Sequence, residues 1–180
     1  RFLSANLEDF DSNNMLINPN EMLSIDRYGL YLVEELQNNV VKDYEAFDFY
    51  LAMQKFLSFC SEDMGGFYLD ILKDRLYTTA ENSHARRSAQ TALFHITQSL
   101  IRLMAPVLSF TAEELWNVIN KKNKSTIFIE SWYKLPNHSL SEKELLGWSH
   151  VLDVRNLANK KIEALREQGV VGSSLQAELK

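Results

Sequence analysis

Apolar residues recur every three or four positions along most of this sequence, and that spacing limits the fold more than any other feature. Within residues 24–44, the recurring apolar side chains are Tyr28, Leu32, Leu36 and Val40. Such spacing puts side chains on one face of an α-helix, whereas a half-buried strand alternates in steps of two. We therefore expect a long helix with one buried face over this range.

The same spacing restarts along the chain, so further helices are expected. Their expected ranges are residues 1–9, 47 to about 63, 66–75, 82–105, 111–120 and 141 to about 168. Residues 126–132, TIFIESW, are expected to form a lone strand or an extended segment. The sequence thus predicts an all-α fold, a helical bundle of about five long helices with up-and-down packing and a small extended segment near 126–132.

Capping signals mark several of the expected helix starts. Ser24 is expected to be an N-cap, and so is Asn82 or Ser83, because their side-chain oxygens can accept a hydrogen bond from a free backbone N–H group. Residues 111–114, TAEE, and residues 141–144, SEKE, both have the form of a capping box.

Glycine and proline predict where the helices are interrupted. Gly65 and Gly66 together cost roughly 2 kcal/mol relative to alanines inside a helix, so we expect a kink or a short break at this pair. Pro106 lacks a backbone N–H donor and should stop or bend its helix. Gly169 and Gly172 are expected to end the last helix.

The composition is that of an ordinary globular chain. Of its 180 residues, 46% are hydrophobic and 24% are charged. No apolar run approaches the roughly 18 residues needed to cross a membrane, and nothing at the start resembles a signal peptide, so we expect a cytoplasmic protein. Cys60 is the only cysteine, which excludes an internal disulfide. The chain starts at Arg1 without a Met and stops at residues 177–180, AELK, without a terminating signal, so we expect it to be a piece of a longer protein.

The net charge of −5 hides an asymmetry along the chain. Residues 1–65 carry 12 acidic and 4 basic side chains, a balance of −8, whereas residues 66–180 carry 12 and 15, a balance of +3. Because the local field steers binding more than the total charge does, an anionic partner is expected to meet the second part.

One helix–turn–helix corner in the second part gathers cations beside an aromatic side chain. The residues are Lys73, Arg75, Tyr77, Arg86 and Arg87. Cations suit a phosphate backbone, and a tyrosine ring suits an unstacked base, with stacking worth ~1–3 kcal/mol per base. The corner is therefore a candidate RNA-binding site. The alternative interpretation is a solvated helix end whose cations only complement the helix dipole.

Catalytic and metal-binding patterns are scarce. Glu81 and His84 match the Glu-x-x-His spacing of a di-metal bundle once, without the second copy that such a site needs. Residues 121–125, KKNKS, match the synthetase signature KMSKS at three of five positions, but we interpret them as a solvated loop because no nucleotide-binding fold surrounds them. We predict no catalytic residue and no metal site in this chain.

Dense motifs identify a family at and around the charged corner. They are RFLxANLxxF at residues 1–10, FYLDxxKDRxY at 67–77, ARRS at 85–88, MAPxLSFTAEExW at 104–116, FxESW at 128–132, VRNxxNKxIExxR at 154–166 and VGxSL at 171–175. Together they resemble the anticodon-binding domain of bacterial-type isoleucyl-tRNA synthetase, a class I aminoacyl-tRNA synthetase, over essentially the whole chain. The MAPxLSFTAEExW element is shared in form with the valyl, leucyl and methionyl relatives, whereas KDRxY points to isoleucine.

This resemblance implies a parent that joins isoleucine to its tRNA with ATP and Mg²⁺, through a catalytic domain, an editing domain and, in many members, a zinc-binding C-terminus. None of the signature motifs of those parts occurs in this sequence, so the piece is expected to hold no cofactor and to be no enzyme by itself. Its expected partners are the anticodon stem-loop of isoleucine tRNA and the parent's other domains, with no membrane and as a monomer. The expected domains are an anticodon-binding domain, 1–140, and a helical extension toward a C-terminal junction, 141–180.

The resemblance also implies which residues face the anticodon: Arg1, Lys73, Arg75 and Tyr77. Arg86 and Arg87 are interpreted either as phosphate contacts or as members of ion pairs within the domain. Asp74 should repel phosphate, so we expect it to orient Arg75 or Arg86 instead of touching RNA.

Two alternative functions remain open from the sequence. The first is a helical protein-interaction module whose charged corner docks an acidic partner. The second is the equivalent domain of a valyl, leucyl or methionyl relative.

Overall fold

The computed structural model of the chain describes residues 2–120, 125–138, 140–173 and 176–178. Within these ranges the protein contains helices and no strand, which confirms the predicted all-α fold. The chain forms two compact units, Arg1–Ser139 and Leu140–Lys180. Within the described residues, no helix combines the length and the apolar character needed to cross a bilayer.

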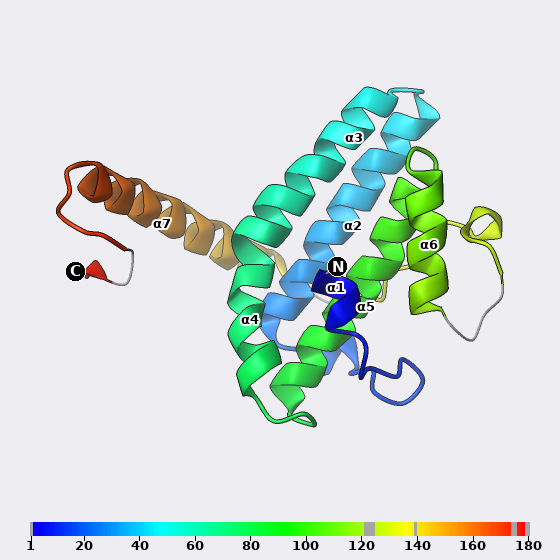
Figure 1. The fold of residues 1–180 in the computed structure, drawn as a ribbon, viewed down its shortest axis with the longest axis horizontal. Coiled ribbons are helices and arrows are strands. Elements are labelled where there is room, and N and C mark those ends of the chain that lie inside the picture. Colours follow the sequence, from blue (N-terminus) through cyan, green and yellow to red (C-terminus); the bar gives the residue numbers. More distant parts are fainter. Residues whose placement is uncertain (1, 121–124, 139, 174–175, 179–180) are drawn as a thin grey trace. The chain divides into compact units, whose positions relative to one another are not determined.

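Among the described residues, six α-helices lie in the first unit (Figure 1) and one lies in the second. The α-helices are α1 (Phe2–Ala5), α2 (Ser24–Glu45), α3 (Phe49–Ser58), α4 (Leu69–Thr78), α5 (His84–Met104), α6 (Ser109–Ile119) and, in the second unit, α7 (Glu142–Glu167). Two 3₁₀ turns, η1 (Pro19–Glu21) and η3 (Ile127–Ile129), and a π-helix, η2 (Phe59–Tyr68), complete the list.

Helix α5 is the centre of the first unit. It contacts α1, α2, α4 and α6, and most of its residues are buried. Leu93, Ile96 and Leu103 on α5 are fully enclosed, as are Leu30 and Val33 on the facing side of α2. Because α5 is covered on several sides, even polar residues along it lie inside the protein, and their hydrogen bonds must be made internally.

Of the kink or short break expected at Gly65 and Gly66, the break is wrong, because α3, η2 and α4 form one continuous helical stretch. An α-helix that buries Phe56 and Phe59 would place Asp63 on the same buried face. In the π-helix the turn is wider, so Met64 is buried instead. Both glycines suit this geometry: a Cβ at Gly65 would lie 3.1 Å from the carbonyl oxygen of Cys60, five residues earlier.

The predicted helix ends are confirmed at some positions and wrong at others. Ser83 caps α5 and Ser141 forms a complete capping box at α7, both as predicted. Ser24 is the first residue of α2 and not its cap, since Leu23 stands at that place without a side-chain hydrogen bond. Helix α6 begins at Ser109, so the predicted TAEE capping box lies within the helix; the chain leaves helical geometry at Leu108 and resumes it at once.

The predicted lone strand at residues 126–132 is also wrong. Ile127–Ile129 form a 3₁₀ turn flanked by extended residues, with Ile127 buried. The Glu130 N–H group donates to the Ile127 carbonyl oxygen at 3.1 Å. A lone strand would leave its backbone groups unpaired, whereas this turn satisfies part of them locally.

Candidate nucleic-acid interface

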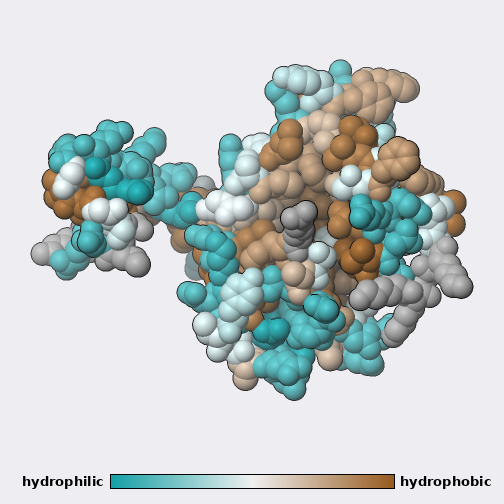
Figure 2. Space-filling model, in the orientation of Figure 1, coloured by the Kyte–Doolittle hydropathy of each residue, from teal (hydrophilic) through white to brown (hydrophobic). Residues whose placement is uncertain are grey.

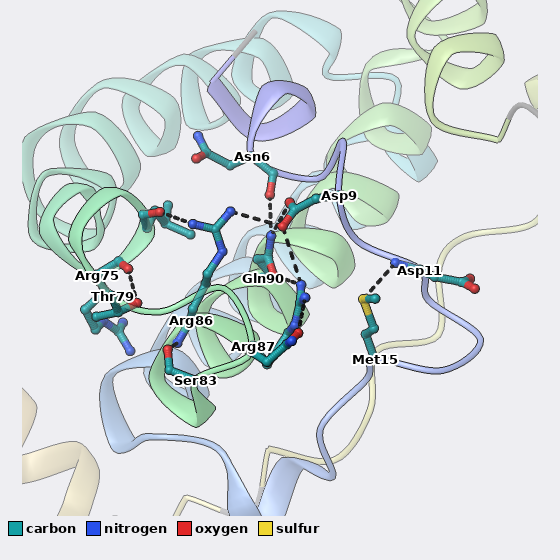
Figure 3. Close-up of polar contacts among 12 residues, drawn as sticks. Asn6, Asp9, Asp11, Met15, Arg75, Thr79, Ser83, Arg86, Arg87 and Gln90 are labelled. Carbon is teal, nitrogen blue, oxygen red and sulfur yellow. Dashed lines mark hydrogen bonds and ion pairs between the residues drawn. The ribbon is translucent and has the colours of Figure 1, made fainter.

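The predicted corner is formed by the end of α4 and the start of α5 (Figure 3). The Arg75 guanidinium reaches the carbonyl oxygen of Ala85 at 3.4 Å, and that of Arg86 donates to the carbonyl oxygen of Leu76. Each helix is thus tied to the backbone of the other. The structure therefore brings Arg75 and Arg86 together, as the sequence predicted.

Arg75 points inward and forms an ion pair with Asp26, in the first turn of α2. Its Nη2 lies 2.6 Å from Asp26 Oδ1 and its Nη1 lies 2.9 Å from Oδ2, so the pair is bidentate. The Asp26 side chain is fully buried and the Arg75 side chain is 17% exposed. Burial lowers the pKa of Arg75, but the hydrogen bonds and the charge of Asp26 outweigh burial and raise it. Arg75 therefore stays charged, with its charge matched inside the protein.

Two hydroxyl groups complete the shell of the Asp26 carboxylate. The Tyr68 hydroxyl donates to Oδ1 at 2.9 Å, and the Ser88 hydroxyl donates to Oδ2 at 2.5 Å. Burial, together with the nearby Asp26 charge, raises the pKa of Tyr68 well above its ordinary value. The phenol therefore keeps its proton and remains a donor to Asp26.

Arg86 and Arg87 meet a second carboxylate, Asp9, in the segment after α1 (Figure 3). The Arg86 Nη2 lies 3.1 Å from Asp9 Oδ2, and the Arg87 Nη1 lies 3.6 Å from the same oxygen. Gln90 donates to Asp9 Oδ1 at 2.8 Å and accepts from Arg87 at 2.6 Å. Burial raises the pKa of Asp9, but the hydrogen bonds from Arg86 and Gln90 and the charge of Arg86 lower it overall. Of the two predicted interpretations of these arginines, the ion pairs within the domain are present.

Lys73 and Tyr77 are the predicted residues that face outward. They lie four positions apart on α4, hence on the same side of that helix. The Lys73 side chain is 53% exposed and pairs with Asp70 at 2.8 Å, in the same exposed row. Tyr77 is 66% exposed. This face offers one cation and one open aromatic ring.

Asp74 does not have its predicted role. The guanidinium groups of Arg75 and Arg86 are held by Asp26 and Asp9, and no hydrogen bond or ion pair joins the Asp74 carboxylate to another described residue. Since the arginine charges are matched internally, the outward side of the corner is less basic than the sequence suggested. Binding of an anion to this outward side would therefore depend on Lys73.

Two predicted regions lie outside the described residues. They are Arg1, predicted to face the anticodon, and positions 121–124 of the lysine-rich loop.

Asp26 and Asp9 are the ion-pair partners at this corner that the sequence did not predict. A signal for Asp26 existed, because it lies four residues before Leu30 and seven before Val33, both fully buried on α2. A carboxylate in a buried register needs a cation as partner. Asp9 has no such signal, since its segment leaves helical geometry after α1.

Comparison with known sequences identifies the class of this fold. The family described as anticodon-binding domain of tRNA ligase matches residues 26–180. The chain therefore belongs to the family of anticodon-binding domains of tRNA ligases.

Individual relatives show which kind of tRNA ligase the chain resembles. The chain is 48% identical to an isoleucine–tRNA ligase of Cupriavidus pinatubonensis, over 99% of this chain and 19% of the relative. It is 48% identical to the isoleucine–tRNA ligase of Dechloromonas aromatica, over 98% and 19% of the two chains. For that of Bordetella avium the identity is 46%, over 99% and 20%. The chain thus spans about a fifth of the length of the curated relatives that it matches.

Proposed function

We propose that this chain binds the anticodon stem-loop of an isoleucine tRNA and positions that tRNA for ATP-dependent aminoacylation elsewhere in a longer isoleucine–tRNA ligase. The observation that carries the proposal is the family match over residues 26–180, together with relatives named isoleucine–tRNA ligase at 46–48% identity. In such a role, phosphate contacts fix the position of the RNA and splayed bases supply its identity.

Lys73 and Tyr77 are the proposed RNA contacts on the corner. Lys73 offers its ammonium group to a phosphate, and Tyr77 offers a ring face for an unstacked loop base. The other cations of the corner, Arg75, Arg86 and Arg87, form ion pairs with Asp26 and Asp9 inside the domain. We therefore assign these arginines a structural role in preference to a role in RNA contact. Arg1 is retained as a proposed contact on the family resemblance alone.

The remaining parts of the function lie outside these residues. We propose that ATP, Mg²⁺ and any Zn²⁺ bind in other domains of the parent. Within the described part of the chain, no three His, Cys, Asp or Glu side chains are placed to hold a metal ion. We further propose that the parent is cytoplasmic and monomeric and that this domain contacts its catalytic and editing domains.

Titration of fluorescent isoleucine tRNA against an unrelated tRNA, over a series of salt concentrations, tests the proposal. Wild type should prefer isoleucine tRNA, with affinity that falls as salt rises. Lys73→Ala should reduce the salt slope by about 1, as expected for one lost phosphate contact. Lys73→Ala with Tyr77→Ala should weaken binding roughly tenfold or more, since stacking alone is worth ~1–3 kcal/mol per base.

A matched control removes the same residue types at the other end of the bundle. Lys42 lies in the last turn of α2, and Tyr50, which is 73% exposed, lies in the first turn of α3. In Figure 1 the α2–α3 connection is at the opposite end of the first unit from the α4–α5 connection. Lys42→Ala with Tyr50→Ala should bind tRNA like wild type. Equal loss in both double variants, or no salt-dependent binding by wild type, would reject the proposal.

The alternative of a protein-interaction module that docks an acidic partner is disfavoured by the same geometry. Three of the four cations of its docking surface, Arg75, Arg86 and Arg87, are already paired with carboxylates of their own domain, which leaves Lys73 as the outward cation. Displacing those carboxylates would leave Asp26 buried and uncompensated, at a cost of several kcal/mol.

A further inference from the structure

Asp26 occupies a position from which it can set the geometry of the proposed RNA-binding face without touching RNA. Its carboxylate is fully buried and accepts four hydrogen bonds, two from Arg75, one from Tyr68 and one from Ser88. These donors belong to α4, η2 and α5, while Asp26 belongs to α2. One side chain therefore joins four helical segments at one point.

The pair between Asp26 and Arg75 fixes the rotation of α4 about its own axis. Arg75 lies two residues after Lys73 and two before Tyr77. Successive residues of an α-helix are about 100° apart, so a two-residue step turns the side chain by about 200°. With Arg75 held inward by two hydrogen bonds to Asp26, Lys73 and Tyr77 both point to the opposite, outward side.

Arg75 itself also ties the end of α4 to the start of α5. The Arg75 carbonyl oxygen accepts a hydrogen bond from Thr79, the residue that follows the helix, at 2.5 Å. The Arg75 guanidinium reaches the Ala85 carbonyl oxygen in the first turn of α5. Tyr77 lies within both spans of chain that these contacts close, 75–79 and 75–85, so its place depends on both.

Stability alone does not explain a buried pair of this kind. Replacing a buried ion pair by apolar residues of similar size is often neutral or stabilising, whereas removing one partner is strongly unfavourable. An apolar replacement would not fix the orientation of the side chain. A bidentate ion pair does, because it accepts one orientation of the guanidinium group.

We infer that Asp26 is a positioning residue for RNA binding, which acts through Arg75 to present Lys73 and Tyr77. This inference rests on the proposed function. Asp26 itself makes no contact with the RNA.

Asp26→Asn in the full 180-residue chain removes the charge and keeps the size of the side chain. We expect affinity for isoleucine tRNA to fall by roughly fivefold or more, a usual size for coupling between separated groups. The slope of binding against salt should stay that of wild type, because no phosphate contact is lost. Amide hydrogen exchange should quicken in residues 72–79 without RNA present.

A control variant separates positioning from general loss of stability. Ile101 is buried in the cluster that α5 forms with α6, around Trp116 and Ile127. Ile101→Ala should lower the unfolding temperature and leave tRNA affinity unchanged, when both variants are measured well below their unfolding midpoints. If Asp26→Asn does not fold, Arg75→Lys takes its place, because lysine keeps the charge and cannot form the bidentate pair.

Each outcome is decisive. The inference is overturned if Asp26→Asn, or Arg75→Lys where it replaces that variant, binds tRNA with wild-type affinity. The proposed function still stands in that case, provided that Lys73→Ala with Tyr77→Ala weakens binding. A reduced salt slope in Asp26→Asn also overturns the inference, since the pair would then contact RNA directly. Absence of salt-dependent binding by wild type rejects the proposed function and the inference together.

Discussion

His95, on α5, is a buried titratable residue whose charge state is controlled by its surroundings. Its Nδ1 lies 2.7 Å from the Tyr133 hydroxyl, and its ring packs edge-on against Phe94. Burial lowers the pKa of His95 to about 4. A neutral ring with its proton on Nε2 can accept the Tyr133 hydrogen at Nδ1, whereas a protonated ring would bring an uncompensated charge into the core. The fold therefore requires neutral His95.

This requirement predicts a pH dependence of stability. The pKa of His95 in the unfolded chain is near 6.5, above its value in the fold, so the unfolded state binds the proton first. The free energy of unfolding should be unaffected by His95 above about pH 6.5 and should fall by about 3 kcal/mol as the pH drops toward 4. Urea unfolding at pH 7.5 and pH 4.5 measures the loss, and His95→Gln should remove most of it. The same pH dependence in His95→Gln would assign the loss to other groups.

The roles of individual residues were the features of this protein hardest to predict from the sequence. The sequence correctly gathers Arg75, Arg86 and Arg87 at one corner, because they are close along two consecutive helices. It does not show that their partners are Asp26 and Asp9, which lie 49 and 77 positions away from Arg75 and Arg86. Helical spacing relates residues on one helix, and pairing across helices depends on how those helices pack.

Helix α2 packs tightly against the π-helix η2 at Gly29. A Cβ at this position would lie 3.0 Å from the Cζ atom of the buried Tyr68 ring and 3.2 Å from both Cε atoms. Inside a helix, alanine is usually more stable than glycine by about 1 kcal/mol. Here the ring would have to move, and with it the hydroxyl that donates to Asp26.

Gly29→Ala should therefore destabilise the first unit by roughly 1–3 kcal/mol, the usual cost of an overpacked core. Thermal unfolding followed by circular dichroism measures the change. Gly147→Ala is the matched control, because Gly147 is also inside a helix, α7, and a Cβ there would meet nothing within 4 Å. That variant should keep or increase helicity. A neutral or stabilising Gly29→Ala would show that Tyr68 moves without cost.

At the level of elements, the sequence predicted the helices better than their junctions. The long ranges of α2, α5 and α7 follow from spacing and from real caps at Ser83 and Ser141. The continuity through Gly65 and Gly66 was missed, because glycine cost assumes α geometry and the π turn gives these residues a different environment. The turn at Ile127 was missed because a short apolar run does not show whether a partner strand exists.

The surface of the first unit differs between its two ends. Figure 2 shows hydrophilic residues gathered over the lower end of the view, where α4 passes into α5. Exposed apolar side chains belong instead to other segments, with Phe47 before α3 and Phe110 in α6 among the most exposed. A polar end suits a hydrated, charged ligand such as RNA, which agrees with the proposed contacts at Lys73 and Tyr77.

The division into two units carries a prediction about the whole molecule. Helix α7 has no buried residue, although it is 26 residues long, whereas the first unit holds the enclosed core around α5. A unit with its own core is expected to fold alone, and an exposed helix adds little to the stability of that core. The boundary near residue 140, expected from the sequence, stays a prediction until this is measured.

A chain that ends at Ser139 should therefore keep the unfolding midpoint of the full chain, by urea titration followed at the tryptophans of the first unit. The full chain should show an additional loss of helicity at lower urea, as α7 melts before the core. Binding of isoleucine tRNA by the shortened chain should keep its dependence on Lys73 and Tyr77, because both belong to the first unit. A lower midpoint in the shortened chain would mean that residues 140–180 stabilise the bundle, and the two units would then be one cooperative domain.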